Sequence, residues 1–100
     1  MFEFIKNLLG IGPQVDVKAL IREGAKVVDV RTPAEYQQGH IKKSMNIPLQ
    51  TLANNLNKLG KDEVIITCCA SGMRSGAARR MLKSYGYKNV HNGGTWSSLQ

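Results

Sequence analysis

The sequence has few of the features that mark membrane, disordered or multidomain proteins. No apolar run approaches the roughly 20 residues that a membrane-spanning helix needs. Leucine, isoleucine, valine and phenylalanine are frequent enough to argue against disorder, in a chain of 100 residues of which 42% are hydrophobic. A chain of this length can bury one core but not two. We therefore expect a single folded domain that has no membrane partner.

Cysteine is scarce, because the chain has only the neighbouring pair Cys68 and Cys69. Adjacent cysteines cannot join distant segments, and a disulfide between them would strain the peptide bond that links them. The two histidines, His40 and His91, do not stand beside these cysteines in the paired spacing of a zinc site. We expect two free thiols, no metal and no other cofactor.

Acidic and aromatic residues are also few. The chain has seven acidic and 14 basic residues, which gives a formal net charge of +7 and indicates an anionic partner. The basic residues never exceed two in succession, and the scattered aromatic residues offer no surface on which bases could stack. We expect no nucleic-acid partner.

The first ten residues, MFEFIKNLLG, place their apolar side chains on one helical stripe. Polar residues interrupt this stripe, and no small-residue cleavage site follows it, so it does not resemble a signal peptide. We expect residues 1–12 to form a docking helix or extension ahead of a domain at 13–100, with contact to a membrane surface as the alternative. The absence of a targeting signal predicts a cytoplasmic protein.

Glycines divide the rest of the chain into alternating β-branched and helical segments. The strand EVIIT is the most apolar and should lie at the centre of the sheet. Alternation of strands and helices predicts right-handed crossovers and a three-layer α/β fold, in which a mostly parallel sheet of four or five strands has helices on both faces. We expect strands at 26–30, 44–47, 63–67 and 88–91, helices at 16–23, 32–38, 48–59 and 75–85, and a terminal turn or short helix with Trp96 and Leu99.

The segment CASGMR follows the most apolar strand and precedes a helix, so we expect Cys69 at the end of a strand and beneath a helix amino terminus. Loop N–H groups, the helix dipole and Arg74 would stabilise a thiolate there and lower the thiol pKa from about 8.5 to roughly 4 to 7. Gly72 would let the loop curl with positive φ. The alternative is an unreactive buried cysteine, which is our interpretation for Cys68 because it should point to the opposite face.

Several motifs in one order resemble those of the rhodanese family. The run VVDVRTPAEYQQGHIKKSMNIPL is similar to the family's DVR, EY, GHI and NIPL signatures, and CASGMRS is similar to its CxxGxR active-site loop. The resemblance covers about residues 15–99 and implies a rhodanese-like fold. It also implies a sulfurtransferase, whose loop cysteine takes a sulfane sulfur from a donor, holds it as a persulfide and passes it to a thiophilic acceptor. Cys69 matches the family's catalytic cysteine.

The loop and the resemblance together define the candidate site. We expect Cys69 to be the nucleophile, and Arg74 either to bind the sulfonate of thiosulfate or to tie the loop to an acidic residue. Asp29, Arg31 and Glu35 should support the site as scaffold, through an internal ion pair such as Arg31 with Glu35. The substrate-binding and active-site loop would consist of Ala70, Ser71, Gly72, Met73, Arg74 and Ser75.

The length of this loop bears on the reaction. Cys69 to Arg74 is six residues, as in rhodanese-like sulfurtransferases, whereas the related cell-cycle phosphatases and arsenate reductases have seven. The expected donor is thiosulfate or a persulfide, and the acceptor is cyanide or a thiol such as thioredoxin or glutathione. Ala70 stands where the family often has a basic residue, which predicts modest affinity for thiosulfate. The alternatives are a persulfide-carrying or regulatory binding module without turnover, and a phosphatase or arsenate reductase of the related fold.

Overall fold

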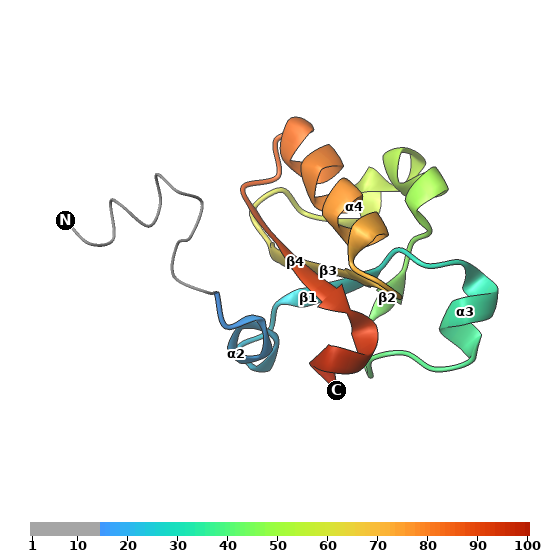
Figure 1. The fold of residues 1–100 in the computed structure, drawn as a ribbon. Coiled ribbons are helices and arrows are strands. Elements are labelled where there is room, and N and C mark those ends of the chain that lie inside the picture. Colours follow the sequence, from blue (N-terminus) through green and yellow to red (C-terminus); the bar gives the residue numbers. More distant parts are fainter. Residues whose placement is uncertain (1–14) are drawn as a thin grey trace.

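Four parallel strands form the sheet in a computed structural model that describes residues 15–100 (Figure 1). Their order is β2-β1-β3-β4, so the EVIIT strand lies inside the sheet, as the sequence predicts. The expected helix at 1–12 lies outside the described residues. The strands are β1 (Lys26–Asp29), β2 (Met45–Asn46), β3 (Val64–Cys69) and β4 (Asn89–Thr95).

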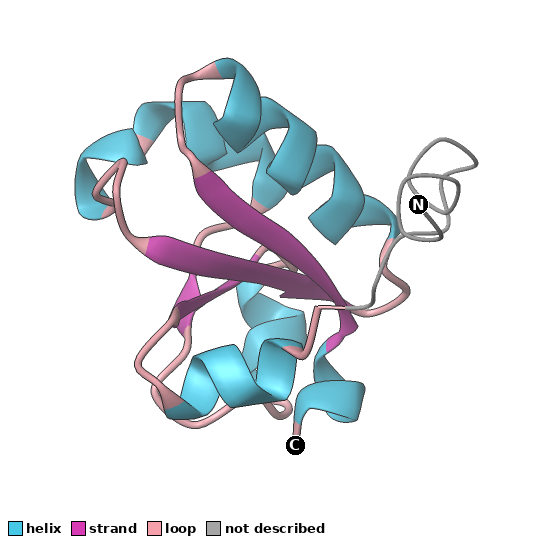
Figure 2. Cartoon of the chain, turned by 90° about the vertical axis from the view of Figure 1, so that its left-hand side faces the viewer, coloured by secondary structure: helices cyan, strands magenta, loops and turns pink. Residues whose placement is uncertain are grey.

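Helices cover both faces of this sheet, which gives the expected three layers. Figure 2 shows α4, η1 and η2 on one side of the strands, and α2 and η3 on the other. Within residues 15–100, no helix combines the length and the apolarity that crossing a bilayer requires. The α-helices are α2 (Val17–Arg22), α3 (Pro33–Gln37) and α4 (Met73–Ser84), and the 3-10 helices are η1 (Leu49–Asn54), η2 (Leu56–Lys58) and η3 (Trp96–Leu99).

The two cysteines belong to different halves of the core. Successive strand residues point to opposite faces of a sheet. Cys68 therefore packs with Ile66 and Leu99 beside α2 and η3, whereas Cys69 packs in the cluster that contains Ala78 of α4. Both cysteines are free and fully buried. The expected separation of the two thiols is confirmed.

The expected helix at 48–59 is wrong, because the segment forms two short 3-10 helices instead. The side-chain amide of Asn55 donates to the Thr51 carbonyl at 2.7 Å, and the backbone N–H of Asn55 bonds to Leu52 instead. An asparagine side chain thus takes the carbonyl that an α-helix would use, which is how this residue type disfavours helix interiors. The leucine spacing still predicts burial correctly, since Leu52 and Leu59 lie in the core.

Strands β3 and β4 both extend beyond the predicted bounds. β3 includes both cysteines, and β4 continues beyond the expected end at residue 91 through Gly93 and Gly94. A Cβ atom on Gly93 would lie 2.7 Å from the Ile66 side chain, so this glycine serves the close approach of β3 and β4. Tyr85, the last residue of the helix expected at 75–85, caps the end of α4 and is 45% exposed.

Candidate active site

Cys69 ends β3, and the chain turns within three residues to enter α4 at Met73. The turn depends on Gly72, which has φ of +93° and is the N-cap of α4. A residue with a side chain rarely adopts this left-handed conformation. The predicted place of Cys69, at a strand end and below a helix amino terminus, is therefore confirmed.

Two backbone N–H groups and one hydroxyl surround the Cys69 sulfur. The N–H of Gly72 donates to Sγ at 2.9 Å and that of Ser75 at 3.4 Å, and the Ser75 hydroxyl oxygen lies 3.5 Å from Sγ. The Ser75 amide is free to do so because the first turn of a helix has no internal acceptors for its N–H groups. We expected donors along the whole loop, but within the described chain the amides of Ala70, Met73 and Arg74 do not bond to the sulfur.

These contacts favour the thiolate form of Cys69. Burial alone would raise the pKa of this thiol, but the hydrogen bonds that Ser75 and Gly72 make to the sulfur outweigh burial and hold the pKa below its ordinary value. Cys68 has the opposite environment, because burial away from such donors raises its pKa to about 12. Of the two thiols, Cys69 is therefore the one whose surroundings favour the thiolate.

Asn92 of β4 completes the surroundings of the sulfur, and the sequence interpretation missed it. Its Oδ1 accepts hydrogen bonds from the Ser75 hydroxyl at 2.6 Å and from the Gly94 N–H at 2.9 Å. Its Nδ2 donates to the Gly72 carbonyl at 3.3 Å. The only signal in the sequence is an asparagine just before the glycine pair, in a strand that pairs with β3.

Arg74 is tied to an acidic residue, which is one of the two roles that the sequence left open. Its guanidinium donates to both carboxylate oxygens of Glu35, at 2.7 and 3.0 Å. This bidentate pair holds the pKa of Glu35 at about 2. Glu35 also forms a capping box with Thr32 at the start of α3, so its carboxylate has a fixed position.

Asp29 and Arg31 form a second, buried ion pair. The expected pair of Arg31 with Glu35 is wrong, because Arg31 Nη2 donates to Asp29 Oδ2 at 2.7 Å, and Glu35 offers Arg31 only its backbone carbonyl, at 3.3 Å. Two residues apart on an extended chain, Asp29 and Arg31 lie on one face and can meet. Arg31 also donates to the Gly39 carbonyl and lies 4.8 Å from the ring centre of Trp96. The pair thus links β1 to the chain that follows α3 and to η3.

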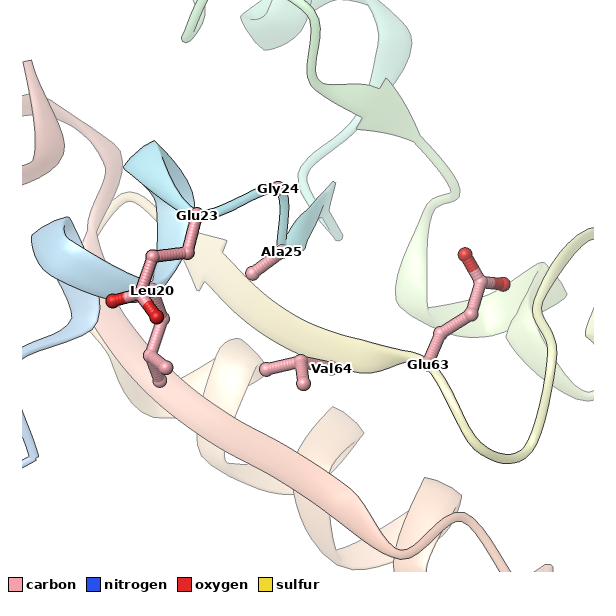
Figure 3. A pocket seen from close by; sticks show the side chains of 6 residues that line it. All are labelled: Leu20, Glu23, Gly24, Ala25, Glu63 and Val64. Carbon is pink, nitrogen blue, oxygen red and sulfur yellow. The ribbon is translucent and has the colours of Figure 1, made fainter.

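The hollow drawn in Figure 3 is separate from this loop. It lies where β1 and β3 begin, since Ala25 precedes β1 and Val64 is the first residue of β3. Cys69 is at the far end of the same strand, about 16 Å further along at the usual rise per residue. The lining residues are Leu20, Glu23, Gly24, Ala25, Glu63 and Val64.

Comparison with known proteins decides the family. Residues 14–94 match the model of the rhodanese-like domain. The chain belongs to the rhodanese-like domain family. This rhodanese-like domain is 35% identical over 69 residues to the thiosulfate sulfurtransferase PspE of Escherichia coli, a match that covers 67% of this chain and 66% of that protein. Among four relatives with 35% to 37% identity, the chain spans 38% to 66% of the relative's length.

Solved structures agree with the family assignment. The crystal structure of reduced CoADR-RHD from Bacillus anthracis has a TM-score of 0.75 at 38% identity and covers 84% of this chain and 15% of that chain. A structure titled rhodanese with anions from E. coli has a TM-score of 0.65 at 32% identity and covers 74% of this chain and 89% of that chain. The expected fold and family are both confirmed.

Proposed function

We propose that this rhodanese-like domain is a sulfurtransferase that carries sulfane sulfur as a persulfide on Cys69. The observation that carries the proposal is the thiol at the end of β3, with Gly72 and Ser75 donating to its sulfur and its pKa lowered. The similarity to a protein named thiosulfate sulfurtransferase supports the same reaction.

The reaction needs two sulfur–sulfur exchanges and no oxidant. In the first, the Cys69 thiolate attacks the outer sulfur of the donor, a new S–S bond forms, and the donor's S–S bond breaks with its electron pair leaving on sulfite or a thiolate. In the second, an acceptor thiolate or cyanide attacks the outer sulfur of the persulfide and restores the Cys69 thiolate. The N–H donors around the sulfur stabilise the negative charge throughout, so the cysteine needs no adjacent base.

The proposed donor is an anion, either thiosulfate or a persulfide. The related structure of rhodanese with anions from E. coli supports a site that accepts such a charge. The proposed acceptor is a thiol such as thioredoxin or glutathione, which would attack the persulfide from the side of the exposed loop residues Ala70, Ser71 and Met73.

Intact-mass measurement of the protein after treatment with thiosulfate or cysteine persulfide tests the proposal. A gain of one sulfur atom that cyanide removes is the expected result, and Cys69→Ser should abolish it. Cys68→Ser is the matched control and should retain most of it, because Cys68 lies on the other face of the sheet. Failure of both donors to load sulfur would refute the proposal, and loading without repeated turnover would support a sulfur-carrying module instead.

A further inference from the structure

The charged groups around the candidate site are already paired. Arg74 is the only charged residue in the loop from Cys69 to Arg74, and both of its terminal nitrogens bond to the Glu35 carboxylate. The nearby Arg31 is occupied in the same way by Asp29. The sulfur therefore accepts hydrogen bonds from N–H groups, while the one charged side chain of its loop is neutralised by Glu35.

The Glu35 carboxylate is held in place by more than its pairing with Arg74. Its Oε1 accepts from the Thr32 N–H and from the Thr32 hydroxyl, each at 3.0 Å, and from Arg74 at 2.7 Å. These contacts fix the carboxylate at the start of α3. There it holds the Arg74 guanidinium, which is therefore not available to bind an anionic donor. The carboxylate that neutralises the charge of Arg74 is therefore held in one position by the structure.

Donors differ in how much positive charge they require. Thiosulfate is a dianion, so its complex with the Cys69 thiolate carries three negative charges. The corresponding complex with an alkyl persulfide carries two negative charges when the persulfide is ionised and one when it is protonated. A free cation beside the sulfur would therefore help thiosulfate more than it helps a persulfide. An arginine whose positive charge is neutralised by a carboxylate gives thiosulfate no such advantage.

Building on the sulfurtransferase function proposed above, we propose that Glu35 is a specificity-determining residue, which neutralises Arg74 and thereby makes alkyl persulfides better donors than thiosulfate. In the favoured reaction the Cys69 thiolate takes the outer sulfur of the persulfide. The bond between that sulfur and the donor's own sulfur breaks, and its electron pair leaves with the donor thiolate. The competing view is that the pair of Glu35 with Arg74 only braces the loop.

A series of charge variants separates these two roles. The quantity measured is the kcat/KM for thiosulfate divided by that for cysteine persulfide, whose amino and carboxylate charges cancel. Glu35→Gln frees Arg74 and should raise this ratio about tenfold, while glutamine still suits the capping box. Arg74→Ala leaves Glu35 unpaired and should lower the ratio. The double variant restores a net charge of zero and should return the ratio to near that of the unchanged protein.

Asp62→Asn is the matched control, because Asp62 pairs with Lys88 at 3.7 Å on the exposed surface and its loss changes the total charge by the same amount. A ratio that does not follow the charge of the Glu35 and Arg74 pair, or that rises equally in Asp62→Asn, overturns the proposal. If Glu35→Gln does not fold, as judged by circular dichroism, Arg74→Ala still decides, because the proposal requires that it lower the ratio and a purely bracing role does not. Absence of sulfur transfer from either donor to the unchanged protein would instead refute the sulfurtransferase function.

Discussion

Asn92 accepts a hydrogen bond of 2.6 Å from the hydroxyl of Ser75, the residue whose backbone N–H points at the Cys69 sulfur. The two residues belong to different elements, since Ser75 lies in the first turn of α4 and Asn92 in β4. Through its other contacts Asn92 also holds the carbonyl of Gly72, the residue with the shortest bond to the sulfur. Asn92 thus fixes both donors around the thiol without touching it.

Asn92→Ala should raise the pKa of Cys69 and slow sulfur transfer roughly tenfold, because the donors that stabilise the thiolate lose their support. The ultraviolet absorbance of the thiolate, followed against pH, measures the pKa directly. Asn89→Ala removes an exposed asparagine at the start of the same strand and is the control. If both variants titrate like the unchanged protein, Asn92 has no such positioning role.

The same absorbance titration should distinguish the two cysteines. Cys69 should ionise with a midpoint below the ordinary pKa of a free thiol, whereas Cys68 should stay protonated until about pH 12. Because the folded-state pKa of Cys69 lies below its unfolded value, its thiolate adds stability that is full above the unfolded pKa and is lost as the pH falls through the folded one. The stability difference between the unchanged protein and Cys69→Ser should therefore increase with pH over that window. If the low-pH step in absorbance is still present in Cys69→Ser, the lowered pKa does not belong to Cys69.

Local patterns in the sequence predicted local contacts well. The helix expected at 32–38 forms as α3, because its capping box of Thr32 with Glu35 spans only three residues and is fixed by helix geometry. The place of Cys69 under a helix amino terminus also follows from a strand, a glycine and a helix in succession. In each case the partners are neighbours in the chain.

Contacts between distant segments could not be predicted in the same way. Glu35 and Arg74 are 39 positions apart, and the sequence indicated Arg31 as the partner of Glu35. Asp29, the last residue of β1, pairs with Arg31, so the Glu35 carboxylate pairs with Arg74 instead. Asn92 was missed for the same reason, because only the pairing of β3 with β4 brings it near the loop.

Gly72→Ala should impair both the loop and the reaction. The φ of +93° at this position makes a side chain costly, by about 1 to 2 kcal/mol, and relief of that strain would move the N–H that bonds to Sγ. Gly24→Ala is a matched control, since Gly24 has φ of +107° and open space around it, and it lies at the other end of the sheet. Urea unfolding should show similar losses for the two variants, but only Gly72→Ala should slow persulfide formation. Equal slowing in both would attribute the effect to stability alone.

Asp29→Asn should be among the most destabilising single substitutions outside the apolar core. It leaves the Arg31 guanidinium, which is 4% exposed, without its counter-charge, and a broken buried pair typically costs about 3 to 5 kcal/mol. Asp62→Asn breaks the exposed pair with Lys88, in which the side chains are 89% and 75% exposed, and surface pairs of this kind contribute about 0 to 1 kcal/mol. Urea unfolding of the two variants compares a buried with an exposed pair in one chain.

The pair of Asp29 with Arg31 connects β1 to the chain around Gly39 and Trp96, so the loss should appear as lower global stability. Similar small losses in both variants would mean that Arg31 finds water or another partner when Asp29 is neutral.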